Sequence, residues 1–177
     1  MPRLTPIDPA TATGTVKEIF DGPLKGKHFN IFKSLANSPA ALQAYLGIGG
    51  ALQNGMLTPA EGEVIALAVG EANGCEYCVS AHTGLGKMAG LTDAQTMEAR
   101  RGRMSDEKLN TLAKFVRTLN EKRGYADEQD LAAMRAAGYT DGHIAEAVMH
   151  FALNTFTNCF NHVTDTEIDL PKAPPLG

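Results

Sequence analysis

Two cysteines separated by two residues are the clearest chemical feature of this 177-residue chain. The segment Cys75-Glu76-Tyr77-Cys78 follows Gly74 directly, where the sequence pattern predicts the start of a helix. The free backbone N–H groups and the positive end of the helix dipole at such a start stabilise an anion. A thiolate is such an anion, so we expect the pKa of one cysteine to fall toward neutrality and its sulfur to become a usable nucleophile. The two cysteines can also close a disulfide across one helical turn.

An imidazole and a carboxylate are spaced so that they can serve these thiols. His82 follows Cys78 by four residues, which places both on one face of a helix. There the imidazole can take the proton of the thiol or stabilise its thiolate. Glu63 lies twelve residues before Cys75, and a tight corner between the two helices would let them pack side by side. Glu63 can then face His82, hold its tautomer and raise its basicity.

The spacing Glu63-x11-Cys75-x2-Cys78-x3-His82 resembles that of the alkylhydroperoxidase D-like (AhpD-like) branch of the carboxymuconolactone decarboxylase family. The match covers about residues 57–91, and residues 154–171 are similar to the ending of peroxidase-related members. The resemblance implies an all-α, AhpD-like fold without significant β-sheet, and an enzyme that reduces hydroperoxides. It also implies that Cys78 is the peroxidatic thiol, Cys75 the resolving thiol, and Glu63 with His82 the proton relay. No haem, flavin or metal is then needed.

One position departs from the pattern of this branch. Its best-known members carry a histidine between the two cysteines, whereas this chain has Tyr77, a departure that bears on the reductant, the local hydrogen bonding and the rate but not on the proton relay. Those members take electrons from a lipoyl-bearing acyltransferase. The resemblance therefore implies a hydroperoxide substrate, a dithiol reductant of the lipoyl-bearing kind and a homo-oligomer, either a trimer or a hexamer. Such a dithiol would reduce the disulfide by thiol–disulfide exchange.

Zinc binding is the main alternative use of these residues. Cys75, Cys78 and His82 have the right donor types, and Cys159 and His162 could complete a tetrahedral site. In that interpretation the upstream carboxylate has no role. A non-redox, decarboxylase-like enzyme of the same family is a second alternative. A third is that the cysteines are only small buried apolar residues, because free cysteine is among the most buried residue types.

For Cys159 and His150 the sequence predicts a role in packing rather than in chemistry. Cys159 lies among phenylalanines and is predicted to be part of the core. His150 lies in the apolar last helix and is predicted to be a hydrogen-bonded core or interface histidine.

A series of helical patterns separated by Gly and Pro positions the candidate site residues. Thr58-Pro59-Ala60-Glu61 predicts the start of the helix that carries Glu63: Thr58 can cap it, Pro59 suits its first turn, and Glu61 can reach back to the cap. No segment shows the alternation typical of a strand. The other predicted helices cover about residues 15–20, 28–36, 39–54, 75–88, 92–101, 105–123, 127–137 and 140–164.

Composition and charge limit the remaining possibilities. The length suits a single domain, with a Pro-rich arm over about residues 1–14 and a Pro-rich tail over about 165–177. The 16 basic and 20 acidic residues argue against nucleic acid or an anionic membrane as the main partner. The first residues lack the apolar stretch of a secretory signal, so we expect a cytoplasmic protein. In a reducing compartment, cysteines are more often catalytic or metal-binding than structural.

Overall fold

The computed structural model describes residues 1–176, and every regular element within them is an α-helix. The prediction of an all-α fold is therefore confirmed. The helices are α1 (Gly14–Asp21), α2 (Asn30–Leu35), α3 (Pro39–Leu52), α4 (Pro59–Ala72), α5 (Glu76–Met88), α6 (Asp93–Arg101), α7 (Glu107–Glu121), α8 (Glu128–Ala136) and α9 (Asp141–Thr164). None of the helices within residues 1–176 combines the length and the apolar character needed to cross a membrane.

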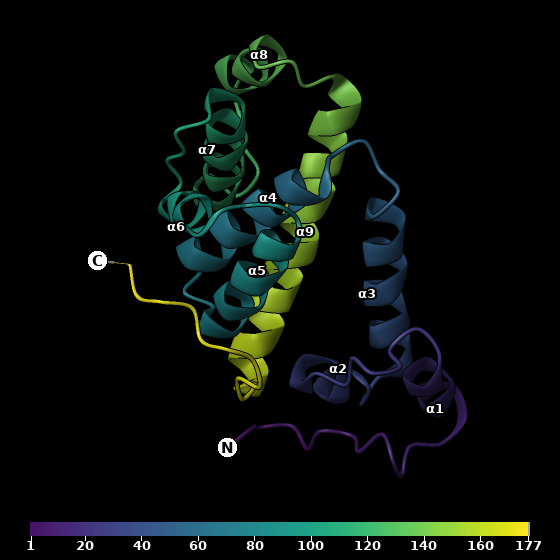
Figure 1. The fold of residues 1–177 in the computed structure, drawn as a ribbon. Helices are drawn as coiled ribbons and strands as arrows, with labels where there is room; N and C mark the ends of the chain where they lie inside the picture. Colours follow the sequence, from purple (N-terminus) through teal and green to yellow (C-terminus); the bar gives the residue numbers. More distant parts are fainter. Residues whose placement is uncertain (177) are drawn as a thin grey trace.

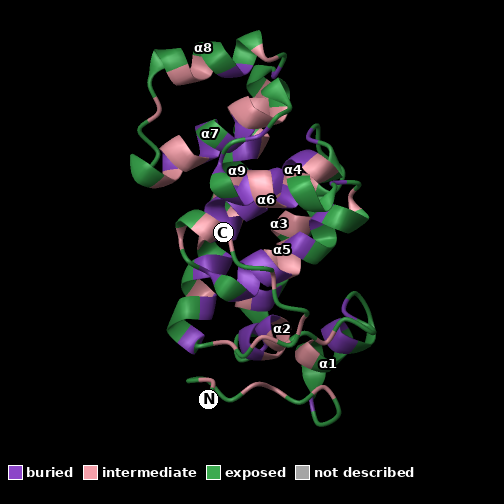
Figure 2. Ribbon diagram, turned by 60° about the vertical axis from the view of Figure 1, so that its left-hand side comes forward, coloured by how far each residue is buried: buried purple, intermediate pink, exposed green. Residues whose placement is uncertain are grey.

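The long helix α9 organises the arrangement of the others (Figure 1). Helices α4 and α5 lie along one side of it, with α6 and α7 beyond them, and α3 stands on the other side. Helix α2 lies near the C-terminal end of α9, with α1 beyond it below α3, and α8 lies near the N-terminal end of α9. Figure 2 shows that α8 is mostly exposed or intermediate, whereas α4 and α5 carry many buried residues.

Helix α4 is the central element, because it packs against α5, α6, α7 and α9. Its interior residues Val64, Ile65, Leu67 and Val69 are completely buried. Such a helix is apolar on most of its surface rather than along one stripe. A second apolar cluster lies at the α1–α2 end of the molecule and includes both Cys75 and Cys78. The cysteine pair therefore belongs to a buried layer between the central helices and the N-terminal helices.

The start of α4 forms as its sequence predicts. The Thr58 side chain accepts a hydrogen bond from the Glu61 N–H, and the Glu61 carboxylate accepts one from the Thr58 N–H at 2.8 Å. Pro59 occupies the first turn, where its missing N–H costs nothing. Lys108 of α7 also pairs with Glu61 at 2.9 Å. This cap fixes the first turn of the helix on which Glu63 is carried.

Both chain termini are extended and bonded to the helical body. The N–H of Arg3 donates to the Thr164 carbonyl at 2.7 Å, and that of Ile7 donates to the Lys33 carbonyl at 2.9 Å. Helix α9 ends at Thr164, and Asp165 follows in a left-handed conformation, so the tail begins where the sequence predicts. The tail then runs back along α5 and α6.

The Glu61 carboxylate should make stability sensitive to acid. Burial alone would raise its pKa, but the hydrogen bonds from Thr58 and Lys108 together hold the pKa below its ordinary value of 4.5. The unfolded chain then takes up the proton first, so the stabilisation is present above about pH 4.5 and is lost as the pH falls below it. We expect Glu61→Gln to show a shallower loss of unfolding free energy in acid, measured by urea denaturation at several pH values. Glu121→Gln, an exposed carboxylate on α7, is the matched control and should keep the parent slope. Equal slopes for Glu61→Gln and the parent would contradict this assignment.

Candidate active site

The turn between α4 and α5 sets the position of both cysteines. Asn73 ends α4, Gly74 adopts a left-handed conformation with φ of 67°, and Cys75 is the N-cap residue of α5. A left-handed residue suits glycine because a Cβ atom is strained there. The helices are in contact at Gly70, where an added Cβ would meet the Val79 side chain at 3.4 Å and the Cβ of Cys78 at 3.6 Å, both ordinary van der Waals distances. The left-handed turn at Gly74 thus lets α5 fold back onto α4.

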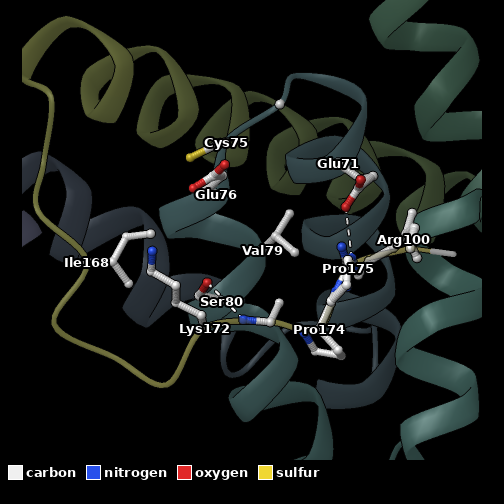
Figure 3. A pocket seen from close by; sticks show the side chains of 13 residues that line it. Glu71, Cys75, Glu76, Val79, Ser80, Arg100, Ile168, Lys172, Pro174 and Pro175 are labelled. Atoms are coloured by element: carbon white, nitrogen blue, oxygen red, sulfur yellow. Dashed lines mark hydrogen bonds and ion pairs between the residues drawn. The ribbon is translucent and has the colours of Figure 1, made fainter.

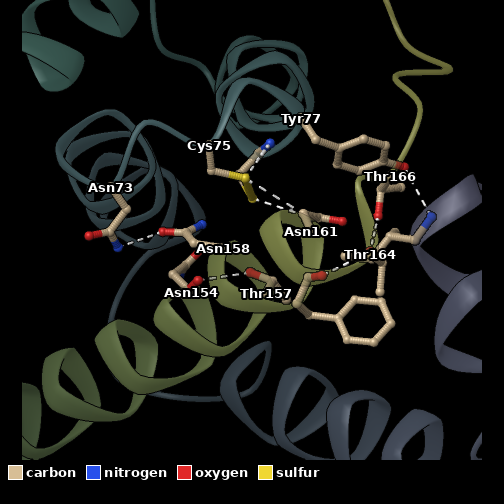
Figure 4. The surroundings of a disulfide bond; sticks show 12 residues. Asn73, Cys75, Tyr77, Asn154, Thr157, Asn158, Asn161, Thr164 and Thr166 are labelled. Atoms are coloured by element: carbon tan, nitrogen blue, oxygen red, sulfur yellow. Dashed lines mark hydrogen bonds between the residues drawn. A yellow bond between two sulfur atoms is a disulfide. The ribbon is translucent and has the colours of Figure 1, made fainter. Parts of the chain in front are cut away.

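The two cysteines are joined in a disulfide whose sulfurs each have a hydrogen-bond donor nearby (Figure 4). The backbone N–H of Cys78 donates to the Cys75 sulfur at 3.3 Å, as a donor at a helix start should. The side-chain amide of Asn161, on α9, donates to the Cys78 sulfur at 3.3 Å and lies 3.9 Å from the Cys75 sulfur. Cys75 is 1% exposed and Cys78 3% exposed. The pair is therefore covered from solvent.

The predicted carboxylate–imidazole pair forms across the two helices. The Nδ1 atom of His82 on α5 lies 2.8 Å from Oε2 of Glu63 on α4. A carboxylate only accepts hydrogen bonds, so it holds the proton on Nδ1 and leaves Nε2 as the basic nitrogen. Both side chains are partly exposed, at 23% for His82 and 19% for Glu63. This pair can accept or deliver a proton close to solvent.

Two further ionisable side chains surround this pair. Burial raises the pKa of Tyr45 on α3, and the nearby charge of Glu63 raises it further. Burial also lowers the pKa of His150 on α9 and so favours its neutral imidazole, while the charges of Glu146 and Glu63 oppose that effect. The His150 ring packs against Gly62, the residue before Glu63. Its Nε2 has no hydrogen-bond partner among residues 1–176, so the prediction of a hydrogen-bonded core histidine is wrong at this atom, and the interface alternative stays a prediction.

Tyr77, the residue that departs from the family pattern, is bonded to two segments that pack with the cysteine pair, α2 and the C-terminal tail. We call these two segments the cover of the disulfide. The Tyr77 hydroxyl donates to Oδ1 of Asp169 in the tail at 2.9 Å and accepts the Ile31 N–H at 3.4 Å. The other oxygen of Asp169 accepts the Asn30 N–H at 2.8 Å. Burial and the Asp169 charge raise the pKa of Tyr77, so this hydroxyl stays protonated and keeps donating. We call this set, Tyr77, Asp169, Asn30 and Ile31, the Tyr77 clasp.

A cleft of about 540 Å³ lies beside α5, between the helices and the tail (Figure 3). The tail is held there by a hydrogen bond from the Ala173 N–H to the Ser80 hydroxyl at 3.2 Å. The Arg100 guanidinium, which is buried, also donates to the Pro174 carbonyl and pairs with Glu71 at 2.8 Å. Cys75 lies at the edge of this cleft, but its sulfur is bonded to Cys78 and lies near Asn161 of α9. The cleft therefore touches the cysteine segment without exposing the disulfide.

The four residues predicted to form the site divide into two bonded pairs on adjacent helices. Cys75 and Cys78 form one, and Glu63 and His82 form the other. Within residues 1–176, no three Cys, His, Asp or Glu side chains are arranged to hold a metal ion. The zinc interpretation therefore lacks a ligand set in this part of the chain.

Cys159 and His162 do not join the cysteine pair. Both are exposed on the outer face of α9, so the prediction of a core position for Cys159 was wrong. The reason is helical phase: the buried face of α9 passes through Asn154, Asn158 and Asn161, and Cys159 lies on the opposite side.

Asn161 is the residue beside the sulfurs that sequence reasoning did not select. The available signal was periodicity, since Asn154, Asn158 and Asn161 recur at steps of four and three residues in an otherwise apolar helix. Asn158 is fully buried and accepts a hydrogen bond from Asn73 at 2.8 Å, and Asn73 in turn accepts one from Asn120 at 2.9 Å. A polar stripe on a buried helix face indicates partners on the facing helices.

Comparisons with known proteins agree with this geometry. Residues 39–121 match the model of the carboxymuconolactone decarboxylase family. The chain is similar to a solved structure described as an alkylhydroperoxidase AhpD core, an uncharacterized peroxidase-related protein from Ralstonia eutropha JMP134, with a TM-score of 0.85, 20% identity, and coverage of 95% of this chain and 92% of that one. A peroxidase-related protein from Silicibacter sp. TM1040 gives a TM-score of 0.78 at 21% identity, over 98% of this chain and 94% of that one. The debrominase Bmp8, in a variant solved in complex with 2,3,4-tribromopyrrole, gives 0.76 at 20% identity, over 94% of this chain and 91% of that one. Among curated proteins, none matches this chain.

The family prediction is thereby confirmed. The segment that carries Glu63, both cysteines and His82 matches the carboxymuconolactone decarboxylase family model, and the chain, over residues 1–176, has the AhpD-like fold. The solved relatives include proteins described as peroxidase-related and a debrominase, so this fold is associated with more than one chemistry.

Removal of the Tyr77 hydroxyl should make the disulfide easier to reach. Tyr77→Phe keeps the ring but deletes the donor to Asp169, at a cost of about 1–2 kcal/mol to the closed cover. We expect dithiothreitol to reduce the Cys75–Cys78 bond about tenfold faster, measured by mass spectrometry of alkylated thiols. Tyr125→Phe is the matched control, because that ring is 81% exposed, and it should keep the parent rate. Unchanged reduction in Tyr77→Phe would show that the clasp does not hold the cover closed.

Proposed function

We propose that this protein is a thiol-dependent peroxidase that reduces hydroperoxides through Cys78 and Cys75, with Glu63 and His82 as a proton relay. The observation that carries the proposal is the 2.8 Å hydrogen bond between Glu63 and His82, one helical turn from a cysteine pair that is close enough to form a disulfide. An oriented imidazole and two neighbouring thiols are the parts that such a reaction needs. The family match and the peroxidase-related structural neighbours support it.

The first step forms a sulfur–oxygen bond. His82, oriented by Glu63, removes the proton of the Cys78 thiol, and the thiolate attacks the distal oxygen of the hydroperoxide. The O–O bond breaks, and the alcohol leaves with the proton that the relay returns. Cys78 is thereby oxidised to a sulfenic acid, and the peroxide is reduced.

The second step closes the disulfide and sets up the next cycle. The Cys75 sulfur attacks the Cys78 sulfenic acid, the S–O bond breaks, and water leaves with the proton of the Cys75 thiol. The helix start favours this step, because the Cys78 N–H that donates to the Cys75 sulfur stabilises a thiolate there. An external dithiol, for which a lipoyl-bearing protein is the best candidate, then reduces the disulfide by exchange and becomes a disulfide itself.

Peroxide consumption by the reduced protein tests the proposal. We expect about one equivalent of peroxide to be consumed per protein, with a Cys75–Cys78 linkage in the peptide mass map. Dihydrolipoamide should restore the thiols faster than thioredoxin. Tribromopyrrole is tested in parallel as a second substrate, because the debrominase neighbour shares the fold. No peroxide consumption with any dithiol would contradict the proposal and favour a non-redox, decarboxylase-like role.

Substitutions at the site should separate the two functional pairs. Cys78→Ser should abolish turnover, because it removes the attacking sulfur. Glu63→Gln should lower the rate of thiol oxidation about 10²-fold or more, since the imidazole loses the partner that fixes its tautomer. Glu71→Gln, on the same helix but paired with Arg100, is the control for a carboxylate outside the relay. The measurement is stopped-flow oxidation by hydroperoxide, and full activity in either Cys78→Ser or Glu63→Gln would contradict the assignment.

We propose further that the protein assembles with copies of itself through the outer face of α9. Its exposed residues include Met149, Phe156 and Val163, at 45%, 40% and 66% exposure. Together with exposed Ala145, Ala152 and Cys159 they recur at alternating steps of four and three residues, the spacing of a helix that packs along another helix. A row of apolar residues of this length is unusual on the surface of a monomer.

Charge placed in this row should disrupt the assembly. We expect Phe156→Glu combined with Val163→Glu to shift the protein from a trimer or hexamer to the monomer in light scattering with size-exclusion chromatography, because burying a carboxylate without a partner is costly. Tyr125→Glu, at another highly exposed aromatic residue, is the control and should leave the mass unchanged. A monomeric parent protein, or an unaltered oligomer in the double variant, would contradict this interface.

A further inference from the structure

We propose that Asn161 is a catalytic residue of this site: its side-chain amide holds the Cys78 sulfur by an N–H···S hydrogen bond and stabilises that sulfur as the thiolate. The inference rests on the proposed function in one respect, that Cys78 is the reacting thiol. The amide nitrogen lies 3.3 Å from the Cys78 sulfur, and Asn161 is 5% exposed. Figure 4 shows it projecting from α9 toward the disulfide.

The Asn161 amide is the hydrogen-bond donor that contacts the Cys78 sulfur among the described residues. Within residues 1–176, the donors to these sulfurs are the Cys78 N–H, which faces Cys75, and the Asn161 side chain. The helix start therefore serves the Cys75 sulfur. Cys78 lies one turn further along the helix and is 3% exposed, a position in which desolvation disfavours a thiolate. A donor from another helix has to compensate, and Asn161 is the one that the structure supplies.

The Asn161 amide should interact more strongly with the reduced cysteine pair than with the disulfide. Its Oδ1 atom is buried and has no partner among residues 1–176, so the amide is positioned for its sulfur contact rather than for a structural network. A disulfide sulfur is a weak, neutral acceptor, whereas a thiolate is a charged one and binds the same N–H more strongly. The hydrogen bond therefore gains strength when the disulfide opens. The amide should lower the pKa of the Cys78 thiol and make Cys78 a better leaving group when a dithiol attacks Cys75.

The ionisable groups around the candidate site have to stay constant in the test. They are Tyr45 on α3, Glu63 on α4, His82 on α5, His150 on α9 and Asp169 in the tail, together with Tyr77 of the clasp. Substitution of Asn161 leaves all of them in place. A shift in the thiol titration can then be assigned to the lost N–H donor.

The experiment measures the thiol pKa of Cys78 directly. A Cys75→Ser, Cys159→Ser background leaves Cys78 as the single thiol of a chain with three cysteines, and serine keeps the N-cap of α5. Thiolate absorbance is recorded against pH for the background, Asn161→Leu, Asn161→Asp and the control Asn154→Leu. Asn154 is equally buried on the same face of α9, but its amide bonds within the helix to the His150 carbonyl.

We expect the pKa of Cys78 to rise by about one to two units in Asn161→Leu, the effect of one lost hydrogen bond to a charged group. Asn161→Asp keeps the shape and replaces the donor with a negative charge, so the pKa should rise at least as far. Asn154→Leu should leave it unchanged. An unchanged pKa in Asn161→Leu, or an equal rise in Asn154→Leu, would overturn the proposal. If Asn161→Leu does not fold, as judged by circular dichroism, Asn161→Ala decides in its place, because it removes the same donor without adding a charge.

The titration needs no peroxide and no reductant. A parent protein that consumes no peroxide but shows the Asn161-dependent pKa would therefore contradict the proposed function and leave the thiolate-stabilising role intact. A parent that turns over peroxide, but whose Cys78 pKa does not depend on Asn161, would contradict the role of Asn161 alone.

Discussion

The close packing of α5 on α4 is the constraint on which the rest of the site depends. Gly74 turns the chain in a left-handed conformation, and Cys78 and Val79 of α5 then lie beside Gly70 of α4. This packing places Cys75 at the N-cap of α5 and Glu63 within 2.8 Å of His82. A methyl group at position 70 would fit in ordinary van der Waals contact, whereas a longer side chain would meet Val79 and Cys78. The turn at Gly74 thus sets the geometry of the candidate site although Gly74 takes no part in chemistry.

The cysteine pair is buried, whereas the proposed reaction needs its sulfur to meet a substrate. A nucleophilic sulfur needs contact with its substrate, yet Cys75 and Cys78 lie in an apolar cluster with residues of α1, α2 and α3. The segments over the pair are held by apolar contacts, from Ile31 and Leu35 of α2 and Ile168 and Leu170 of the tail, and by the hydrogen bonds of the Tyr77 clasp. Access to the sulfurs therefore requires these segments to move and some apolar surface to be exposed. Tyr77, between the cysteines, joins the cysteine segment to the tail.

The local features of this molecule were predictable from sequence, and the long-range ones were not. Thr58 with Glu61, and the paired glycines and threonines that end and begin helices, act within a few residues, so their patterns predicted the helices closely. The Glu63–His82 pair was predictable because the two residues lie on consecutive helices that are joined by a single short turn. The contacts of Tyr77 with Asp169 and of Cys78 with Asn161 join residues 92 and 83 positions apart. They depend on how α9 and the tail dock, which no local pattern encodes. Cys159 was misplaced for the same reason, since its helix has apolar residues on both faces.

In the proposed reaction cycle the site has to accommodate two oxidation states, and an amide beside the sulfurs suits both. A lysine or arginine at position 161 would stabilise a thiolate more strongly, but in the disulfide state it would leave a buried cation without a counter-ion, at a cost of several kcal/mol. An apolar residue would suit the disulfide and leave the buried thiolate without a donor. The carboxamide is neutral, so its burial is tolerable beside a disulfide, and it still offers an N–H when charge develops on Cys78. The stripe of asparagines on α9 is then consistent with a helix face that has to remain packed while the charge of its neighbour changes.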